Sequence, residues 1–381
     1  MQFIQPDINI DFIGKRLIGF SLSGAFILIS LLSLLLHGGP RYGIDFAGGT
    51  LIQIKFNVPT DSDAIKETLK PLGINGASIQ QYGDVTDNEY LIRADMSYEK
   101  LEGLSEKVQQ AFINAMSDSE ESEQSSEDKT ASISEEQTPT TQSSTDKEIS
   151  ENSETSKAPP VEVRRIEMVG PQVGKDLREK ALLAMFFALL FITIYISGRF
   201  EFKWVISGVM AACLMGGVYF FKVLNVSMPF LIFLALILAM VLFWFLRLKY
   251  AMGAIAALIH DVMITVGIFS IFDKEFTLPI IAALLTIIGY SLNDTIIVFD
   301  RIRENSRKLH RFTFDQIINK SINETLSRTI LTSLTTLVVV ISLFLFGGGI
   351  IHDFAFAMII GVLIGTYSSI FVASPILLLW R

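Results

Sequence analysis

Long apolar stretches with few charged residues dominate the pattern of hydrophobic and polar positions along this chain. The first stretch, 17–36, holds twenty residues, and a helix of that length at 1.5 Å per residue extends about 30 Å, enough to cross a bilayer core. The stretches after residue 180 follow one another closely, and with the first they predict a polytopic α-helical membrane protein of about eight spans. The later predicted spans are 181–197, 204–222, 229–246, 250–271, 277–299, 329–346 and 354–374.

A polar stretch, 41–175, separates the first span from the others and alternates strand and helix signals. Period-two alternation predicts strands, and apolar residues three and four positions apart predict helices. The resulting order of strand, helix, strand, strand, helix, strand is typical of a small ferredoxin-like α+β domain. The predicted strands are 51–56, 77–82, 89–94 and 161–168, and the predicted helices are 61–72 and 98–116.

The segment 117–160, between the second predicted helix and the last predicted strand, is rich in Ser, Glu and Thr. It holds twelve acidic residues and three lysines, so it carries a charge of −9 against −8 for the whole chain. Such a composition buries too little apolar surface to offset the entropy of ordering, so we predict a disordered acidic insertion. A charged docking tail is the alternative. Neither part of the chain's charge indicates a nucleic-acid partner.

Basic residues predict which side of the membrane each loop occupies, because Lys and Arg collect in cytoplasmic loops. Lys15 and Arg16 place residues 1–16 in the cytoplasm, so the predicted domain 41–175 is extracytoplasmic. With eight spans, most of the basic loops between the later spans fall in the cytoplasm, as does the C-terminus. No obvious cleavage site follows the first span, so we expect a retained anchor and a multi-pass protein among membrane lipids.

The connection 301–328 is the longest of the predicted cytoplasmic loops. Thr313 and Gln316 resemble a capping box, and the apolar residues of 314–322 fall on one helical face. This pattern predicts an amphipathic helix that lies on the inner membrane surface or packs beneath the bundle. A site for anionic lipid headgroups is the alternative.

An ionisable residue, Asp294, lies inside the apolar run 277–299. A charge near the bilayer centre costs about 2.5–3.5 kcal/mol on insertion scales, so such carboxylates usually face a protein interior and serve a function. Arg328 enters the next span at a similar depth, so the two side chains could pair and separate. A carboxylate that alternates between an ion pair and a protonated state suits a proton relay, with Asn293 in support. The alternatives are an Asp294 that merely joins two helices and a snorkelling Arg328.

His260 and Asp261 lie in the middle of the predicted span 250–271. Adjacent helix positions point about 100° apart, so the two side chains cannot face one path equally. Asp261 is the weaker second candidate for the relay, and His260 is a candidate for a hydrogen bond to a neighbouring helix. Gly361 and Gly365 form a small-xxx-small face that favours close helix packing.

Several classes of chemistry find no support in the sequence. No His or Cys besides His260 has a suitable spacing to complete a metal site, so we expect no metal site. The chain has no P-loop and no nucleophile elbow, so neither ATP hydrolysis nor peptidase activity is indicated. We therefore expect a transport protein without a cofactor rather than an enzyme.

Six motifs give nearly the whole chain a specific resemblance to the SecF family of protein-export subunits, within the RND-like superfamily. They are GIDFAGGT at 43–50, VGPQVGKDL at 169–177, HD at 260–261, GYSLNDTIIVFDRIREN at 289–305, TLSRT at 325–329 and GTYSSI at 365–370. The family's proton-path Asp and Arg match Asp294 and Arg328. Its structural glycine motif matches Gly43, Asp45, Gly48 and Gly49.

The resemblance implies a subunit of the bacterial cytoplasmic (inner) membrane that works with a SecD-like subunit and the SecYEG translocon. It would use the proton motive force to promote late-stage translocation of unfolded preproteins. The first alternative is an RND-like, proton-driven exporter of small molecules or lipids, although about 90 ordered outer residues are few for an enclosing cleft. A purely structural scaffold is the second alternative.

Two features depart from the family pattern. A family member has six spans, whereas this bundle, 178–381, contains an extra apolar hairpin at 204–246. A hairpin adds two spans and preserves the topology downstream, so we expect the six-span core to survive. The acidic insertion 117–160 is the second departure.

Overall fold

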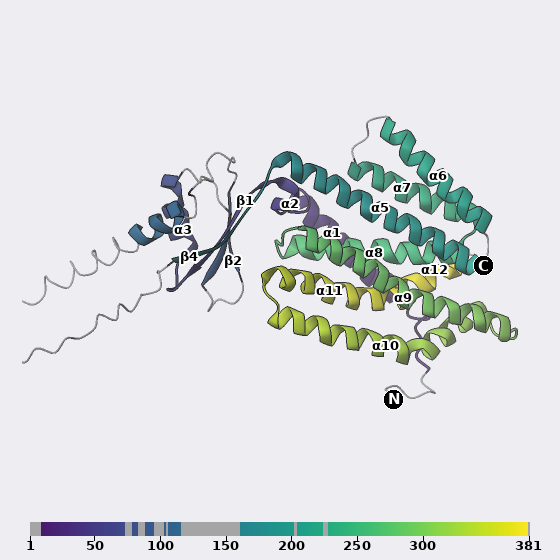
Figure 1. The fold of residues 1–381 in the computed structure, drawn as a ribbon. Helices are drawn as coiled ribbons and strands as arrows, with labels where there is room; N and C mark the ends of the chain where they lie inside the picture. Colours follow the sequence, from purple (N-terminus) through teal and green to yellow (C-terminus); the bar gives the residue numbers. More distant parts are fainter. Residues whose placement is uncertain are drawn as a thin grey trace, which may run out of the picture. The chain divides into compact units, whose positions relative to one another are not determined.

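The computed structural model describes residues 9–72, 78–82, 88–94, 103, 106–115, 161–201, 204–223 and 228–379. The predicted acidic insertion 117–160 lies outside this part of the chain. The chain divides into two compact units (Figure 1). The helical unit comprises Met1–Gly48 and Pro171–Arg381, and the α/β unit comprises Gly49–Gly170. The α/β unit thus falls within the predicted domain 41–175, whose two edges belong to the helical unit.

Six helices in the described part of the chain are long and apolar enough to cross a membrane. The protein is therefore a polytopic helical membrane protein. These helices are α1 (Arg16–Leu36), α5 (Pro171–Glu201), α8 (Lys249–Ile271), α9 (Leu278–Lys308), α10 (Phe314–Phe346) and α11 (Gly349–Ser368), the last continued by short turns to Leu379.

The predicted hairpin 204–246 forms two helices, α6 (Trp204–Val223) and α7 (Met228–Leu246). They pack against each other and against α5. Their apolar stretches among the described residues, Ala211–Phe220 and Leu234–Leu246, are shorter than those of the six long helices. A total of eight spans therefore stays a prediction.

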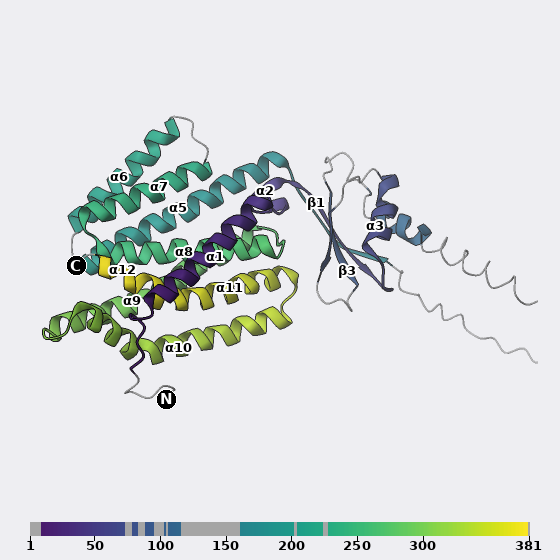
Figure 2. The same cartoon turned by 180° about the vertical axis from the view of Figure 1, so that it is seen from behind.

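Helix α8 is the most buried of the six long helices, and α10 is the most exposed. Helix α9 packs against both α10 and α11, and α1 packs along α8, as Figure 2 shows. Helix α1 also meets the end of the chain, since Tyr367 donates a hydrogen bond of 2.7 Å to the carbonyl oxygen of Gly19. A Cβ atom on Gly19 would lie 2.9 Å from Phe371, so glycine permits this close contact.

The predicted connector 301–328 is built from the ends of two long helices rather than from a separate helix. Its first part continues α9 and its last part begins α10. The predicted capping box opens α10, where the backbone N–H of Thr313 donates to Gln316 Oε1 at 3.2 Å. Arg301 of α9 and Glu324 of α10 form an ion pair of 2.6 Å, which ties the two helix ends together.

The start of the described chain is held against α10 by two amide side chains. Asn319 Oδ1 accepts a hydrogen bond of 2.8 Å from the backbone N–H of Phe12, and Asn323 Nδ2 donates one of 2.9 Å to the carbonyl oxygen of Ile10. A cavity of about 660 Å³ lies beside this contact, and polar and charged residues such as Asp315 and Lys320 line it.

The α/β unit contains a four-stranded antiparallel sheet in the order β2–β3–β1–β4. The predicted order of strands and helices is found, because α3 (Ser62–Leu69) follows β1 and a helix at 106–115 precedes β4. Alternate residues of β1 point into a core that both helices cover. The strands are β1 (Gly49–Phe56), β2 (Ser78–Tyr82), β3 (Glu89–Ala94) and β4 (Val161–Val169).

The glycine motif forms a tight turn that contacts the start of α9. Gly43 donates its backbone N–H to the carbonyl oxygen of Phe276 at 2.8 Å, and the short helix α2 (Ile44–Ala47) follows. Gly48 and Gly49 have φ angles of 80° and 118°, values that favour glycine over residues with a Cβ atom. Residues 43–48 of the motif therefore have a structural role in the helical unit.

Asp45 acts as a cap for α9 from outside that helix, because its Oδ2 accepts the backbone N–H of Leu278 at 2.9 Å. Replacing Asp45 by alanine leaves this N–H without its acceptor and is expected to cost about 0.5–2 kcal/mol of stability. Thermal unfolding of the purified protein in detergent measures the loss. Asp45→Asn keeps an acceptor oxygen and serves as the control; equal losses in the two variants would contradict the capping role.

Candidate functional site

Asp294 lies inside the helix bundle, with 1% of its surface exposed. Its Oδ2 accepts a hydrogen bond of 3.4 Å from Ser333 on α10. The Ser333 hydroxyl also lies 2.6 Å from the hydroxyl of Thr366 on α11. The other carboxyl oxygen of Asp294, Oδ1, has no hydrogen-bond partner among the described residues. The carboxyl group therefore sits where α9, α10 and α11 meet, with half of its hydrogen-bonding capacity unused.

Arg328 is exposed on the surface of the chain, five residues before Ser333 on α10. No ion pair between Arg328 and Asp294 occurs in the described part of the chain, where Ser333 is the group that contacts the carboxylate. Asn293 is also exposed, since it lies one position from the buried Asp294 and turns about 100° away. The structure therefore brings neither predicted neighbour into contact with Asp294.

Asp261 is fully buried, and three side chains surround its carboxyl group. Its Oδ2 accepts hydrogen bonds from Ser291 on α9 at 2.5 Å and from Ser368 on α11 at 2.8 Å. Its Oδ1 lies 2.9 Å from Nδ1 of His260 on the same helix. This second carboxyl group joins α8 to α9 and α11 with every oxygen satisfied, unlike Asp294.

His260 extends the Asp261 cluster to the first helix, as the expected bond to a neighbouring helix requires. Its Nε2 lies 3.0 Å from the hydroxyl of Ser23 on α1. The Ser23 hydroxyl lies 3.1 Å from the hydroxyl of Tyr367, whose ring stacks on the imidazole. His260 and Asp261 therefore belong to one network, because their side chains contact each other. In this network His260 reaches α1, and Asp261 reaches α9 and α11.

The small residues of α11 allow these contacts. A Cβ atom on Gly361 would lie 2.3 Å from Cγ1 of Ile287, and one on Gly365 would lie 3.0 Å from Cβ of Ser291. Helix α11 can thus approach α9 closely, as the small-xxx-small pattern predicts. This approach carries Ser368 to Asp261 on one side of α9 and Thr366 to Ser333 on the other.

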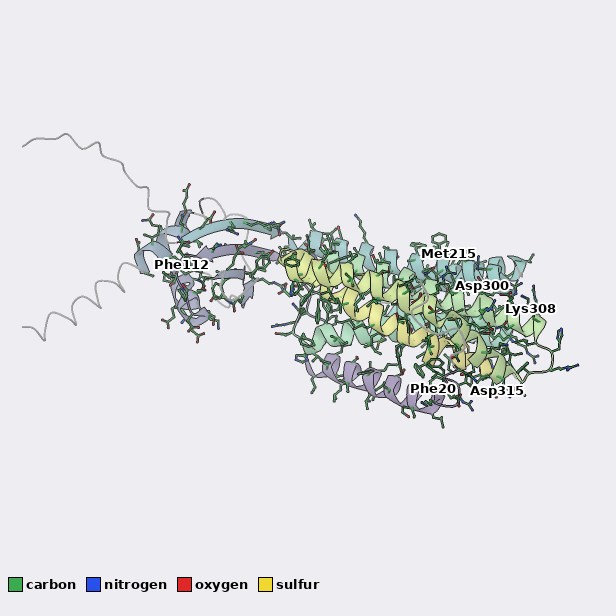
Figure 3. The ribbon with its side chains drawn as sticks, turned by 90° about the horizontal axis from the view of Figure 1, so that it is seen from below. Phe20, Phe112, Met215, Asp300, Lys308 and Asp315 are labelled. Carbon is green, nitrogen blue, oxygen red and sulfur yellow. The ribbon has the colours of Figure 1, made fainter. Side chains whose placement is uncertain are left out.

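Charged side chains collect at one end of the helical unit. Figure 3 labels Asp300, Lys308 and Asp315 there, and Asp300 pairs with Arg199 of α5 at 2.7 Å. The two buried carboxyl groups lie apart from this polar end, inside the apolar part of the bundle. Within the described residues no group of three His, Cys, Asp or Glu side chains could hold a metal ion.

Sequence reasoning did not identify Ser333 as the partner of Asp294, Thr366 as the partner of Ser333, or Ser23 as the partner of His260. Hydroxyl residues are common in apolar helices, where most of them donate to their own helix backbone; Thr335, for example, donates to the carbonyl oxygen of Leu331 at 3.0 Å. A signal exists in hindsight, because Ser333 lies in a hydroxyl-rich part of an apolar helix, 327–336, and Thr366 lies in another, 366–369. That signal identifies a partner only when the rotation of each helix is known.

The family comparisons agree with the arrangement of these helices. Residues 149–220 and 222–381 match the family described as protein export membrane protein SecD/SecF, C-terminal, and residues 33–60 match the SecD/SecF GG motif. The protein translocase subunit SecF of Magnetococcus marinus is 39% identical over 379 residues, which cover 100% of this chain and 94% of that protein. The SecF of Calditerrivibrio nitroreducens is 37% identical over 382 residues, which cover 100% of this chain and 96% of that protein.

A solved structure shares the fold. The crystal structure of SecDF, a translocon-associated membrane protein from Thermus thermophilus, superposes with a TM-score of 0.64 and 27% sequence identity. The match covers 99% of this chain and 39% of the SecDF chain. This chain therefore corresponds to a little over a third of that larger protein.

Proposed function

Because this chain belongs to the SecF family of protein translocase subunits, a part of the SecDF protein-export machinery, we propose that it couples a proton gradient to preprotein export. It is a transport protein rather than an enzyme. Protons that bind and leave Asp294 would drive the late phase of translocation. A SecD-like subunit and the SecYEG translocon are its proposed partners, and an unfolded preprotein is the substrate.

The unsatisfied carboxyl oxygen of Asp294 is the observation that supports this proposal. A carboxylate that is 1% exposed is unfavourable in an apolar bundle unless charges or hydrogen bonds compensate it. Here one hydroxyl contacts Oδ2 and none of the described residues contacts Oδ1. The charge of such a carboxylate is poorly compensated in this arrangement, and a cation that moved closer would compensate it.

Arg328 is the proposed cation. It lies on α10, the most exposed of the six long helices, and a rotation or shift of α10 relative to α9 would bring its guanidinium toward the carboxylate. Pairing would release the proton, and separation would restore the arrangement seen here. We further propose that Asp261 serves as a second, weaker proton-binding group and that Asn293 supports the relay from the exposed face of α9.

The proposed topology follows the sequence. We place residues 1–16 and the C-terminus in the cytoplasm and the ferredoxin-like α+β domain on the outer side of the bacterial cytoplasmic membrane. The first span is 17–36, and α6 and α7 would add two spans to the six-helix core. The polar end of α9 and α10 then faces the cytoplasm.

The test uses inverted membrane vesicles that contain this chain, its SecD-like partner and the translocon. Completion of preprotein export is measured after the ATP-driven step, with a proton gradient and after a protonophore has removed it. The expected result is a late phase that the gradient accelerates only when this chain is present. The same two measurements are made on vesicles that lack this chain. If the late phase has the same rate with and without the gradient, and with and without this chain, proton-coupled export is contradicted.

A further inference from the structure

The cavity of about 660 Å³ between the start of the described chain and the first turns of α10 has the size of a small-ligand site. Its lining is mainly polar. Asn319 and Asn323 of α10 hold its two walls together, because their side-chain oxygens accept hydrogen bonds of 2.8 Å from the backbone N–H groups of Phe12 and Ile10. The cavity is therefore a built feature of the helical unit, and its lining defines which ligand it suits.

Charged residues of both signs line this cavity. The bases are Arg16 and Lys320, and the acids are Asp11, Asp315 and Glu324. Glu324 is already paired, because Arg301, which lies outside the lining, approaches it to 2.6 Å. The other two acids balance the two bases, so the cavity suits a zwitterion better than an anion.

The two bases keep hydrogens for a ligand. Both side chains are exposed. Arg16 donates to the carbonyl oxygen of Ile13 at 3.5 Å, and the Lys320 ammonium lies 5.6 Å from the centroid of the Phe312 ring. A guanidinium has five N–H donors and an ammonium three, so both can also bind an anionic group such as a phosphate.

The charges follow the same order along both walls of the cavity. Asp11 precedes Arg16 by five residues, and Asp315 precedes Lys320 by five. Each base is thus closer along the chain to the apolar part of its helix, which begins at residue 17 in α1 and at residue 330 in α10. A phospholipid with an ethanolamine headgroup has the matching order, because its phosphate adjoins the acyl-chain end and its ammonium lies beyond the phosphate.

The wall formed by α1 continues into a surface that suits acyl chains. Leu17 and Ile18 are 73% and 68% exposed. Phe20 lies one turn after Arg16 on the same face and is 38% exposed. Figure 3 labels Phe20 and Asp315 at the same end of the helical unit. A lipid whose headgroup enters the cavity can therefore place its chains along α1.

We propose that this cavity binds the headgroup of a phospholipid with a primary ammonium, of the phosphatidylethanolamine class. Arg16 and Lys320 bind the phosphate, and Asp11 and Asp315 accept hydrogen bonds from the ammonium. Oδ1 of Asp11 already accepts the backbone N–H of Gly14 at 2.7 Å, so its Oδ2 is the oxygen that faces the ligand. The bound lipid joins the start of α1 to α10.

Two other classes of headgroup fit this lining less well. The quaternary ammonium of choline has no N–H to donate, and proteins recognise it with a cage of aromatic rings. Among the described residues that line the cavity, Phe312 is the one aromatic residue, and Lys320 already lies over its ring. An anionic headgroup without an ammonium would leave Asp11 and Asp315 unmatched and would be repelled by them.

Native mass spectrometry of the purified full chain in detergent tests the selectivity. The chain is titrated with three dioleoyl phospholipids that differ in their headgroup: ethanolamine, choline or glycerol. The dissociation constant is expected to be roughly tenfold lower for the ethanolamine lipid than for the other two, the effect of a charge-assisted hydrogen bond. Equal affinity for the three lipids would show unselective lipid contact and contradict the proposal.

Substitutions that remove a charge and nearly keep the size test each half of the site. Lys320→Gln is expected to weaken the binding of all three lipids, because each of them has a phosphate. Asp315→Asn should weaken the ethanolamine lipid alone, roughly tenfold, and Asp11→Asn, which keeps an acceptor oxygen for its own turn, should do the same. If both acid variants keep the preference for ethanolamine, the assignment of the ammonium site is wrong.

Lys308→Gln is the matched control for the basic half. Lys308 pairs with Glu304 at 2.6 Å near the same end of the helical unit, outside the cavity lining. This variant should bind the three lipids as the unmodified protein does. If it loses as much affinity as Lys320→Gln, the lipids respond to the overall charge of this end and the cavity is not their site.

A soluble compound distinguishes a lipid from a free zwitterion. Glycerophosphoethanolamine has the same headgroup and lacks acyl chains. It is expected to bind at least roughly a hundredfold more weakly than the dioleoyl lipid, because the chains add apolar contact along α1. If it displaces the ethanolamine lipid at equal concentration, the cavity binds a soluble zwitterion and the lipid assignment is wrong.

Discussion

Replacement of Asp294 by asparagine is expected to abolish the acceleration of export by the proton gradient while leaving export without a gradient unchanged. Asparagine has nearly the same shape as aspartic acid, and its side-chain oxygen can still accept the hydrogen bond from Ser333. It cannot bind and release a proton at any physiological pH. The substitution therefore removes the titratable group and keeps the packing, and the vesicle assay with and without a protonophore measures the difference.

A second carboxylate on the same helix provides the control. Asp300 pairs with Arg199 at the polar end of the bundle, and both side chains are more than two fifths exposed. An exposed ion pair contributes at most about 1 kcal/mol, so Asp300→Asn should retain the response to the gradient. If Asp294→Asn responds to the gradient as strongly as Asp300→Asn does, the chain acts as a scaffold rather than as a coupling subunit.

Substitution of Gly361 by alanine is expected to disrupt the central helix contact of the bundle. The new Cβ atom would lie 2.3, 2.5 and 2.8 Å from the Cγ1, Cδ1 and Cγ2 atoms of Ile287. Isoleucine is branched at Cβ and stiff in a helix, so no rotation moves all three atoms away. Helices α9 and α11 must separate, at a cost of about 1–3 kcal/mol in a packed core. Thermal unfolding in detergent measures the cost.

Other glycines of the same bundle give a graded series. A Cβ atom on Gly365 would lie 3.0 Å from Ser291, and one on Gly289 would meet nothing within 4 Å. The loss of stability should therefore be largest for Gly361→Ala, smaller for Gly365→Ala and absent for Gly289→Ala. Gly361→Ala should also weaken the response to the gradient, because the same approach of α11 positions Thr366 beside Ser333. Equal stability of Gly361→Ala and Gly289→Ala would contradict the packing argument.

Elements of this fold that depend on local composition could be predicted from the sequence. The apolar run 250–271 corresponds to α8, and the alternating residues 51–56 lie within β1, because burial of a helix stripe or a strand face requires that periodicity. The order of strands and helices in the α/β unit was also predictable. The ends of α9 and α10 were harder. The apolar face of 314–322 predicts a helix but does not show that this helix continues into α10, and pairs such as Arg301–Glu324 hold the two helix ends together.

The partners of the buried acids could not be predicted, because they depend on how each helix is rotated about its axis. The depth of Asp294 followed from its distance to the charged end, and depth suggested Arg328 as its neighbour. The side chain that meets it is Ser333, one turn and a residue farther along α10. The partner of His260 was equally hard to predict, because it depends on which neighbouring helix the imidazole reaches. That helix is α1, where Ser23 is the partner.

The contact between α1 and the end of the chain has a consequence for biosynthesis. Ser23 and Gly19 find Tyr367 as their partner, 344 and 348 residues later in the sequence. At a synthesis rate of about 5–20 residues per second, roughly 20–70 s pass between the appearance of the first helix and that of its last partner. During this interval α1 lacks Tyr367, so its Gly19 face stays uncovered even after α8 has supplied His260 as a partner for Ser23. Ribosome-bound chains that stop before residue 367 should therefore leave α1 open to crosslinking by lipid or by other membrane proteins, and completion of the chain should close it.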